Sequence, residues 1–513
     1  MRTRLQMTAK NAIWSYVSMI VSFGLSFVSR TVFIYTLGES YLGVNGLFTN
    51  VLGVLSFAEL GIGTAFGFSL YKPVANGDIE KIKSYMHYYK IAYRVIAAVV
   101  TVLGLAILPL LHFIIKDPGD IGNIYIYYLI FLFNTVSSYF VSYKFSLVNA
   151  EQKNYIFTNI NLLVSVSTTI LQIVSLLLFR NFLVYLLVAA AFGLFQKIFI
   201  SIYFNKLYPY LKEKDCKPIT AEDKATLISK VKALIVHKLG EVSVHQTDNI
   251  IVSSFVSTVM VGLISNYTLI TTTVSGFINI LFNSVTGSLG NMIAVESKEH
   301  QYSIFKKYRF IGFWLYGFSA IAISILSKPF ITLWAGDKMV VDPLVINLMM
   351  IDYYMIGHRI CLNNMKSAGG VFEPDKYIAL IQAAVNLVAS IALVNIIGLP
   401  GVYLGTIIQG SIASIVKPIL SYKIMFNRSS KYYFIDSIKY GVMVVLAYLL
   451  CYGFSELVIP KITILSFIFK ILFVAIVPNL LFFLVFKRTE EFQYFSAIAK
   501  RIIKRVIKKK EKN

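Results

Sequence analysis

Fourteen long apolar runs occupy most of this chain. A helix that crosses the hydrocarbon core of a bilayer needs about 20 such residues, and its backbone polar groups must be paired within the segment. The runs lie at residues 11–36, 41–70, 90–112, 122–148, 155–179, 181–204, 229–256, 260–287, 308–331, 342–365, 377–397, 401–424, 437–457 and 463–486. They predict an all-α polytopic membrane protein with about fourteen transmembrane helices.

The composition excludes the soluble classes of protein. Hydrophobic residues make up 57% of the chain and charged residues 14%, against about 45–50% and about 25% in soluble domains. A soluble enzyme, a disordered chain and a fibrous repeat are excluded. The net charge of +23 lies in short segments between apolar runs, so it indicates membrane topology and contact with lipid headgroups rather than nucleic acid. The three cysteines are scattered and predict neither disulfides nor a zinc site.

The basic residues predict the orientation of the chain. With the N-terminus inside, 37 of the 48 Lys and Arg residues fall in the predicted inside segments and five in the outside loops. This asymmetry is the pattern of a protein of the cytoplasmic membrane that has both termini in the cytoplasm.

Two hydrophilic segments, the stretch between the sixth and seventh runs and the C-terminal tail, suggest a division into five parts. The predicted parts are an N-terminal six-helix lobe at 1–205, a cytoplasmic linker at 206–232, a C-terminal six-helix lobe at 233–425, two additional helices at 426–486 and a basic cytoplasmic tail at 487–513. In the tail, Ile502, Ile503, Val506 and Ile507 follow helical spacing. The tail is either a basic amphipathic helix on the inner leaflet or a solvated stop-transfer segment.

Ionisable residues within the runs are the candidate functional groups, because a charge inside the bilayer must face protein or a wet cavity. In the seventh run, Lys238, Glu241, His245 and Asp248 share one helical face, which is either an ion-pair ladder between helices or the wall of a wet cavity. The full set comprises the basic Arg30, Arg94, Lys197, Lys238, Arg359 and Lys470, the acidic Glu59, Glu241, Asp248 and Asp352, and three histidines.

The tenth run repeats this arrangement with fewer groups. Asp352 and Arg359 lie on one face but about 10 Å apart along the helix axis, so each needs another partner or water. Small polar stripes on the first and eighth runs indicate either close packing or, together with the charged face of the seventh run, a shared cavity.

No motif for catalysis, a metal or a nucleotide is present in the chain. The glycines between Gly61 and Gly67 fall within the second run and indicate helix packing rather than a phosphate loop. A carrier without catalytic residues, metal or cofactor is therefore the simplest class. Arg30 precedes Gly43 by 13 residues and Asp248 precedes Gly262 by 14, a weak echo that a parallel repeat of two six-helix lobes would produce.

An ordered set of short motifs across residues 1–425 resembles the Wzx-type oligosaccharide flippases of the multidrug/oligosaccharidyl-lipid/polysaccharide exporter superfamily. The residues that carry this resemblance are Ser29, Arg30, Leu37, Gly38, Tyr41, Gly43, Leu47, His237, Gly240, Thr247, Asp248, Asn249, Val252, Val261, Asn266, Tyr267, Pro329, Trp334, Gly336, Ala368, Phe372, Asn386, Ser390, Gly398, Gly401, Gly405 and Thr406.

The resemblance implies two six-helix lobes around a V-shaped cavity, alternating access and a lipid-linked oligosaccharide as cargo. The cargo would be a polyprenyl pyrophosphate carrying sugars, whose anionic part needs cations in the cavity. The candidate cargo-binding cations are Arg30, Lys238 and Arg359. The candidate ion-coupling groups are Glu59, Glu241, His245, Asp248 and Asp352. Expected partners are the cargo, membrane lipids under the basic tail and polysaccharide synthesis machinery.

Three alternatives stay open. A small-molecule drug or cation antiporter of the same fold would favour an acidic cavity, whereas the intramembrane set has six basic and four acidic residues. A polysaccharide polymerase or ligase would need a sizeable outside loop, and none is predicted. A scaffold subunit of a synthase complex would not need charged inward faces.

Overall fold

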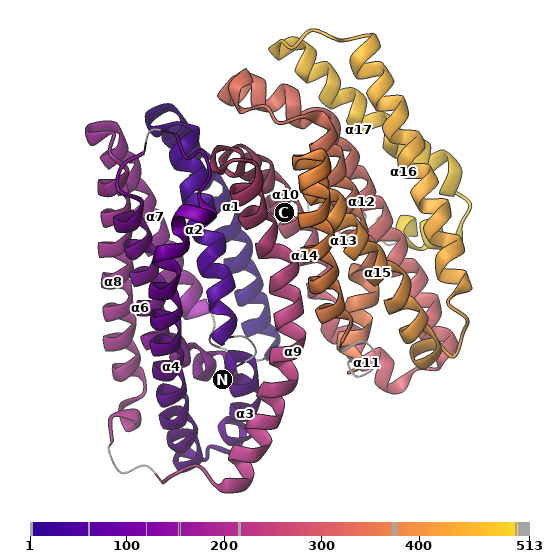
Figure 1. The fold of residues 1–513 in the computed structure, drawn as a ribbon. Coiled ribbons are helices and arrows are strands. Elements are labelled where there is room, and N and C mark those ends of the chain that lie inside the picture. Colours follow the sequence, from indigo (N-terminus) through magenta and orange to yellow (C-terminus); the bar gives the residue numbers. More distant parts are fainter. Residues whose placement is uncertain are drawn as a thin grey trace, which may run out of the picture. The chain divides into compact units, whose positions relative to one another are not determined.

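The computed structural model describes residues 4–59, 62–119, 121–151, 153, 155–213, 217–371, 377–497 and 500. Side chains within these ranges are described except those of 4–15, 57–58, 64–65, 68, 212, 230, 232–245, 284, 287–288, 291 and 294. Nearly all of the described residues are helical, and no strand is found among them. Figure 1 shows the course of the chain.

The chain forms two compact units. The first comprises Met1–Ser265 with Ala379–Ala383, and the second comprises Asn266–Ile378 with Ala384–Asn513. The helices up to the start of the second unit are α1 (Arg4–Leu37), α2 (Glu39–Leu55), η1 (Ser56–Glu59), α3 (Ile62–Asn76), α4 (Ile79–Ile107), η2 (Leu108–Leu110), α5 (Leu111–Ile114), α6 (Ile124–Ala150), α7 (Tyr155–Phe179), α8 (Phe182–Leu207), η3 (Pro209–Lys212), α9 (Ala221–Ile251), η4 (Val252–Val256) and α10 (Thr258–Ser284). The later helices are α11 (Thr286–Val295), α12 (Lys298–Ala335), η5 (Asp337–Met339), α13 (Pro343–Ala368), α14 (Ile378–Ile397), α15 (Leu399–Phe426), α16 (Lys431–Leu457) and α17 (Ile464–Phe486).

The predicted class, an all-α polytopic membrane protein, is confirmed. In the described part of the chain, eleven helical segments are long and apolar enough to cross a membrane. The three predicted runs that are not among them correspond to α2 with α3, to α9 and to α13. The first of these is divided by the turn η1, and α9 and α13 carry the charged faces noted in the sequence. Apart from Arg30, which lies on the apolar α1, the candidate cargo and coupling residues thus lie on the segments least suited to lipid.

Several predicted helix boundaries are wrong, and two of them show why. The run at 308–331 corresponds to α12, which begins ten residues earlier, at Lys298. The Ser297 side chain accepts a hydrogen bond from the His300 amide and caps this longer helix, whose first turns are polar. The run at 41–70 is not one helix, because η1 follows α2 at Ser56. The Ser56 hydroxyl donates to the Gly53 carbonyl oxygen at 2.6 Å, and such local bonds compete with regular helix.

In the first unit, α6 lies between α4 and α8, while α7 packs against α8 and α1 (Figure 1).

A close contact joins α2 to the beginning of α10. A Cβ atom placed on Gly262 would lie 2.6 Å from the Gly43 nitrogen, and one on Gly43 would lie 2.1 Å from the Thr258 oxygen. The two glycines noted at equivalent spacing in the sequence therefore face each other, and only glycine allows this approach.

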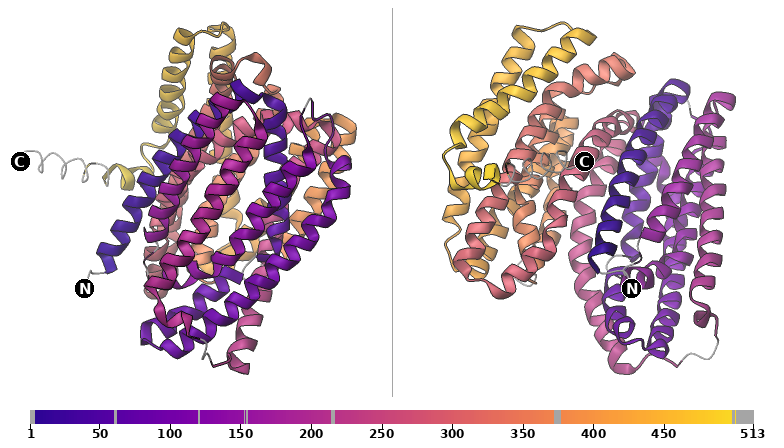
Figure 2. Two further views of the ribbon diagram at one scale, coloured as in Figure 1. Left: turned by 90° about the vertical axis from the view of Figure 1, so that its left-hand side faces the viewer. Right: turned by 180° about the vertical axis from the view of Figure 1, so that it is seen from behind.

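In the second unit, α12 packs against α13 and also against the antiparallel pair α16 and α17 (Figure 2). Aromatic rings of Phe310 and Phe313 on α12 meet Tyr440, Phe482 and Phe486. These rings hold the additional C-terminal helices to the rest of the unit.

The first turns of the C-terminal tail return to α12. Glu491 forms an ion pair with Lys306 at 2.9 Å. Burial alone would raise the pKa of Glu491, but the Lys306 ammonium group outweighs it and the pKa is lowered. The remainder of the tail, with the predicted amphipathic residues Ile502, Ile503, Val506 and Ile507, lies outside the described residues.

Candidate functional site

The predicted cation Arg30 lies in α1 and is held by a single described hydrogen bond. Its guanidinium group donates to the Ser265 hydroxyl on α10 at 2.9 Å, and that hydroxyl donates to the Gly262 carbonyl oxygen at 2.6 Å. The close approach of Gly262 to α2 fixes the position of Ser265. No carboxylate among the described residues forms an ion pair with Arg30. The remaining guanidinium donors can therefore bind an anion.

The predicted coupling group Glu59 is the last residue of η1. The Tyr93 hydroxyl on α4 donates to its carboxylate at 3.3 Å. The Tyr93 ring lies close to that of Tyr139 on α6, with centroids 6.5 Å apart. The break between α2 and α3 thus brings a carboxylate against a tyrosine-lined face of α4 and α6. A carboxylate with one long hydrogen bond can exchange a proton more readily than one held in an ion pair.

The charged face predicted on α9 is described only at its end. The backbone of α9 is helical throughout, but the side chains of Lys238, Glu241 and His245 lie outside the described residues. Asp248 is half-buried, one turn before the π-helical turn η4. The shared face of the four residues and the cavity around it stay predictions.

Arg359 and Asp352 on α13 are both directed to α15. Arg359, which is 7% exposed, donates from Nη1 to the Gly410 carbonyl oxygen and to the Ser414 hydroxyl, the latter at 2.9 Å. A Cβ placed on Gly410 would lie 3.3 Å from Asp352 Oδ1. That oxygen is buried and has no hydrogen-bond partner among the described residues. Asp352 and Arg359 form no described ion pair, in agreement with their predicted separation along the helix.

A buried arginine that the sequence did not single out lies nearby in the second unit. Arg309 on α12 is 2% exposed and donates to the Tyr433 carbonyl oxygen at 2.8 Å and to the Ser437 hydroxyl at 2.5 Å. It also lies 3.0 Å from His358 Nε2, and its guanidinium carbon is 3.7 Å from the centre of the Tyr433 ring. Through these contacts the Arg309 guanidinium group links α12, α13 and α16. Its role is therefore structural.

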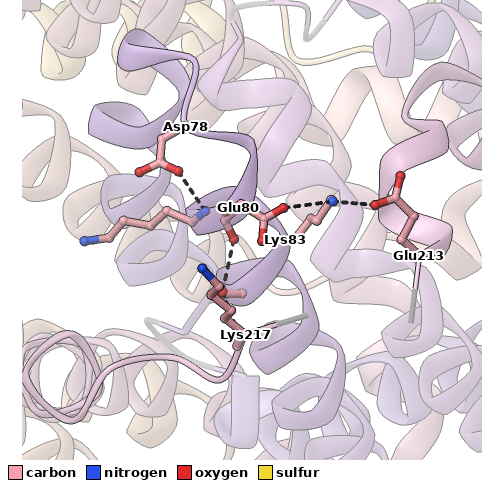
Figure 3. Close-up of polar contacts among 7 residues, drawn as sticks. Asp78, Glu80, Lys83, Glu213 and Lys217 are labelled. Atoms are coloured by element: carbon pink, nitrogen blue, oxygen red, sulfur yellow. Dashed lines mark hydrogen bonds and ion pairs between the residues drawn. The ribbon is translucent and has the colours of Figure 1, made fainter. Parts of the chain in front are cut away.

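The segment between α8 and α9 is fastened to the beginning of α4. Figure 3 shows the Lys83 ammonium group between the carboxylates of Glu80 and Glu213, at 3.0 and 2.5 Å. Nearby, the Ser84 hydroxyl donates to the Lys217 carbonyl oxygen at 2.6 Å. These contacts, together with the ion pair between Lys81 and Asp223, form what we call the linker clip.

The pair of Lys81 and Asp223 closes the linker clip at the first turn of α9. The two groups are 2.9 Å apart, and the Lys81 ammonium group lowers the pKa of Asp223. A lowered pKa in the folded state means that this contact is complete at neutral pH and is lost as the pH falls through the lowered pKa. The clip is therefore formed under physiological conditions.

We expect Lys83→Met to loosen the linker clip. The exchange keeps the apolar part of the side chain but removes the charge that holds two carboxylates, one of them on the linker. Trypsin should then cleave between residues 206 and 224 several-fold faster in the folded protein. Lys81→Met is the matched control, because the Lys81 side chain is 42% exposed against 8% for Lys83 and ion pairs of exposed side chains contribute little. Equal cleavage rates for wild type and Lys83→Met would show that the clip does not hold the linker.

Solved structures of transporters have the same arrangement of helices. An inward-facing multidrug resistance MATE family transporter of the MOP superfamily superposes with a TM-score of 0.59 at 16% identity, over 79% of this chain and 96% of that one. The lipid II flippase MurJ in an inward closed conformation gives a TM-score of 0.62 at 14% identity, over 93% of this chain and 98% of that one.

The chain has the MATE-like fold. A mutant of the Vibrio cholerae MATE transporter VcmN adds a TM-score of 0.56 at 16% identity, over 83% of this chain and 99% of that one. No protein-family model and no curated protein sequence matches the chain. The MATE-like fold thus rests on the three-dimensional arrangement of helices, which is retained at identities of 14–16%. The three solved structures are of two MATE transporters and a lipid II flippase.

Proposed function

We propose that the protein is a flippase that carries a polyprenyl-pyrophosphate-linked oligosaccharide across the cytoplasmic membrane by alternating access, for cell-surface polysaccharide synthesis. The MATE-like fold supports transport, and the motifs that resemble Wzx-type flippases support the class of cargo. A lipid-linked cargo is preferred to a soluble one because of one observation. The lipid II flippase superposes on a larger share of this chain than the MATE transporters do.

The lipid II flippase matches 93% of this chain, which leaves about 36 of its 513 residues outside the match. The segment from Lys431 to Asn513 has 83 residues, so more than half of it has a counterpart in that flippase. The two MATE transporters leave 17% and 21% unmatched, about 87 and 108 residues, enough to omit this whole segment. The helices α16 and α17 therefore favour the lipid flippase as the functional analogue.

The chemistry of the cations agrees with this choice. A pyrophosphate that leaves water needs fixed positive charges, and arginine binds phosphate oxygens through two parallel hydrogen bonds. Arg30 has donors left for such a ligand, whereas Arg359 and Arg309 are committed to contacts within the second unit. Among the three predicted cargo cations, Arg30 is thus the one that the described contacts support, and Lys238 stays a prediction.

Ion coupling is the second part of the proposal. The buried Oδ1 of Asp352 and the weakly held carboxylate of Glu59 are two described groups, beside Asp248, that can take up a proton or cation during transport. The similarity to multidrug MATE transporters supports a second candidate function, the antiport of a small organic cation, for which the same two carboxylates would be the binding groups.

Reconstitution distinguishes the two functions. Purified protein in vesicles should move a fluorescent polyprenyl-pyrophosphate disaccharide from the inner to the outer leaflet, measured as dye that becomes reducible by external dithionite. Protein-free vesicles and a fluorescent phosphatidylcholine are the controls, and neither should show movement. Efflux of ethidium without movement of the glycolipid would instead establish the antiporter and refute the flippase.

A further inference from the structure

A second group of cations lies in the first unit, near the middle of α4 and in the last turns of α6 and α8. Lys144 on α6 is 3% exposed, and its ammonium group donates to the Ser201 hydroxyl on α8 at 2.7 Å. One turn before Ser201, Lys197 donates to the Asn134 carbonyl oxygen at 2.9 Å and to the Ser137 hydroxyl at 2.6 Å. Both lysines thus have neutral partners.

Two more cations on α4 lie beside Lys144. The helix α4 packs against α6 in antiparallel fashion, since the Tyr93 and Tyr139 rings lie 6.5 Å apart and the Tyr128 hydroxyl donates to the Gly104 carbonyl oxygen. This pairing places Lys90 within about one helical turn of the level of Lys144, and Arg94 one turn further along α4. Lys90 and Arg94 are both exposed. None of these four cations forms an ion pair with a carboxylate anywhere in the described part of the chain.

This arrangement is unfavourable without an anion. A buried ammonium group loses its hydration, and a second cation close to it adds repulsion. The exposed neighbours of Lys90 and Arg94 are Ile91 and Val95, at 46% and 57% exposure, so lipid chains can pack beside the two cations. The apolar runs begin at residue 90 and end at residues 148 and 204, so the cations lie at the level where hydrocarbon gives way to headgroups.

We propose that Lys90, Arg94 and Lys144 form a binding site for the phosphate group of a membrane lipid. Arg94 and Lys90 would donate to the phosphate oxygens from the exposed face of α4, and Lys144 would supply the buried charge behind them. Two lipids offer this chemistry, an anionic phospholipid of the bilayer and the pyrophosphate of a polyprenyl-linked cargo. The site does not depend on the proposed function, because a structural phospholipid would satisfy the same charges.

Native mass spectrometry of the purified full chain tests the site with three probes, namely phosphatidylglycerol, a polyprenyl pyrophosphate and diacylglycerol without a phosphate. We expect the double variant Lys90→Gln with Arg94→Gln to bind the phosphate-bearing probe about tenfold more weakly or worse, because two charge-assisted contacts are lost. Diacylglycerol should bind equally to both proteins. Lys431→Gln with Lys439→Gln on α16 is the matched control, since it removes two exposed cations from the start of another helix.

The two phosphate probes distinguish the lipid. Weaker binding of phosphatidylglycerol alone would assign the site to a bilayer phospholipid, and weaker binding of the polyprenyl pyrophosphate would assign it to the cargo. Unchanged binding of both probes, or an equal loss in the Lys431 and Lys439 variant, would overturn the proposal. Both substituted positions are exposed, so loss of folding is not expected to obscure the result, and a thermal unfolding curve checks it.

Discussion

Replacing Arg30 with glutamine is expected to lower glycan export about a hundredfold while the amount of protein in the membrane stays the same. The loss corresponds to one or two charge-assisted hydrogen bonds to the cargo pyrophosphate, at about 1.5–3 kcal/mol each. Stability should change little, because Arg30 has one described hydrogen bond to lose and its partner, the Ser265 hydroxyl, keeps its own bond to the Gly262 carbonyl oxygen. The measurement compares cell-surface polysaccharide with membrane protein level in a strain that depends on this chain.

Arg359→Gln is the contrasting variant on the same assay. Arg359 is 7% exposed and donates to Gly410 and Ser414 on α15. Its loss removes two charge-assisted hydrogen bonds that join α13 to α15, at about 1.5–3 kcal/mol each. We therefore expect less protein first and less glycan as a consequence. Normal glycan with normal protein in Arg30→Gln would refute the role of Arg30 in cargo binding, and loss of both in that variant would make Arg30 a structural residue.

A lysine substitution at Arg30 tests whether charge alone or the shape of the guanidinium group is needed. Arg30→Lys keeps the positive charge but removes the planar pair of donors that matches phosphate oxygens. Retained export would mean that charge alone is sufficient. Export as low as in the glutamine variant would mean that the geometry of the guanidinium group is required.

The architecture was predictable because lipid imposes a simple rule on sequence. A run of twenty or more apolar residues can only be helical in a bilayer, and the predicted runs coincide with helices. The ends were not predictable from apolarity, as Lys298 shows: the first ten residues of α12 are largely polar, yet the helix continues through them to the Ser297 cap. The break at Ser56 depends on a local hydrogen bond that leaves no signal in hydropathy.

The sequence identified which ionisable residues are candidates, but it did not identify their hydrogen-bond partners. Arg30, Glu59, Asp352 and Arg359 were recognised because charge inside an apolar run is unusual, but their partners Ser265, Tyr93 and Ser414 come from distant helices.

Arg309 and Lys144 were missed because both lie near the end of a run, where a basic residue suggests contact with the cytoplasm. A signal for Arg309 was present, since Tyr302, Phe305, Arg309, Phe313 and Tyr316 follow the spacing of one helical face and are all buried.

The final prediction concerns Asp352, which we propose as the ion-coupling group of the second unit. Asp352→Asn should abolish transport driven by an ion gradient while the protein remains at least as stable as wild type. Burial of a carboxylate whose Oδ1 has no described hydrogen-bond partner is costly, and a neutral amide of the same shape reduces that cost. Arg359 keeps its hydrogen bonds to α15 in this variant, so the helix contact should persist. A stabilising change that removes activity is the behaviour of a functional group.

Two measurements in vesicles decide this prediction. Gradient-driven accumulation of the fluorescent glycolipid should fall to the level of protein-free vesicles in Asp352→Asn, because an amide can neither bind nor release a proton. Exchange of glycolipid between leaflets without a gradient should continue, since alternation of an uncoupled carrier needs no titrating group. Glu59→Gln and Asp248→Asn test the other described candidate carboxylates in the same way and identify which of the three carries the ion. Gradient-driven transport that persists in Asp352→Asn at wild-type rate would exclude Asp352 as the coupling group, and loss of both transport modes with normal protein would place it instead in cargo binding.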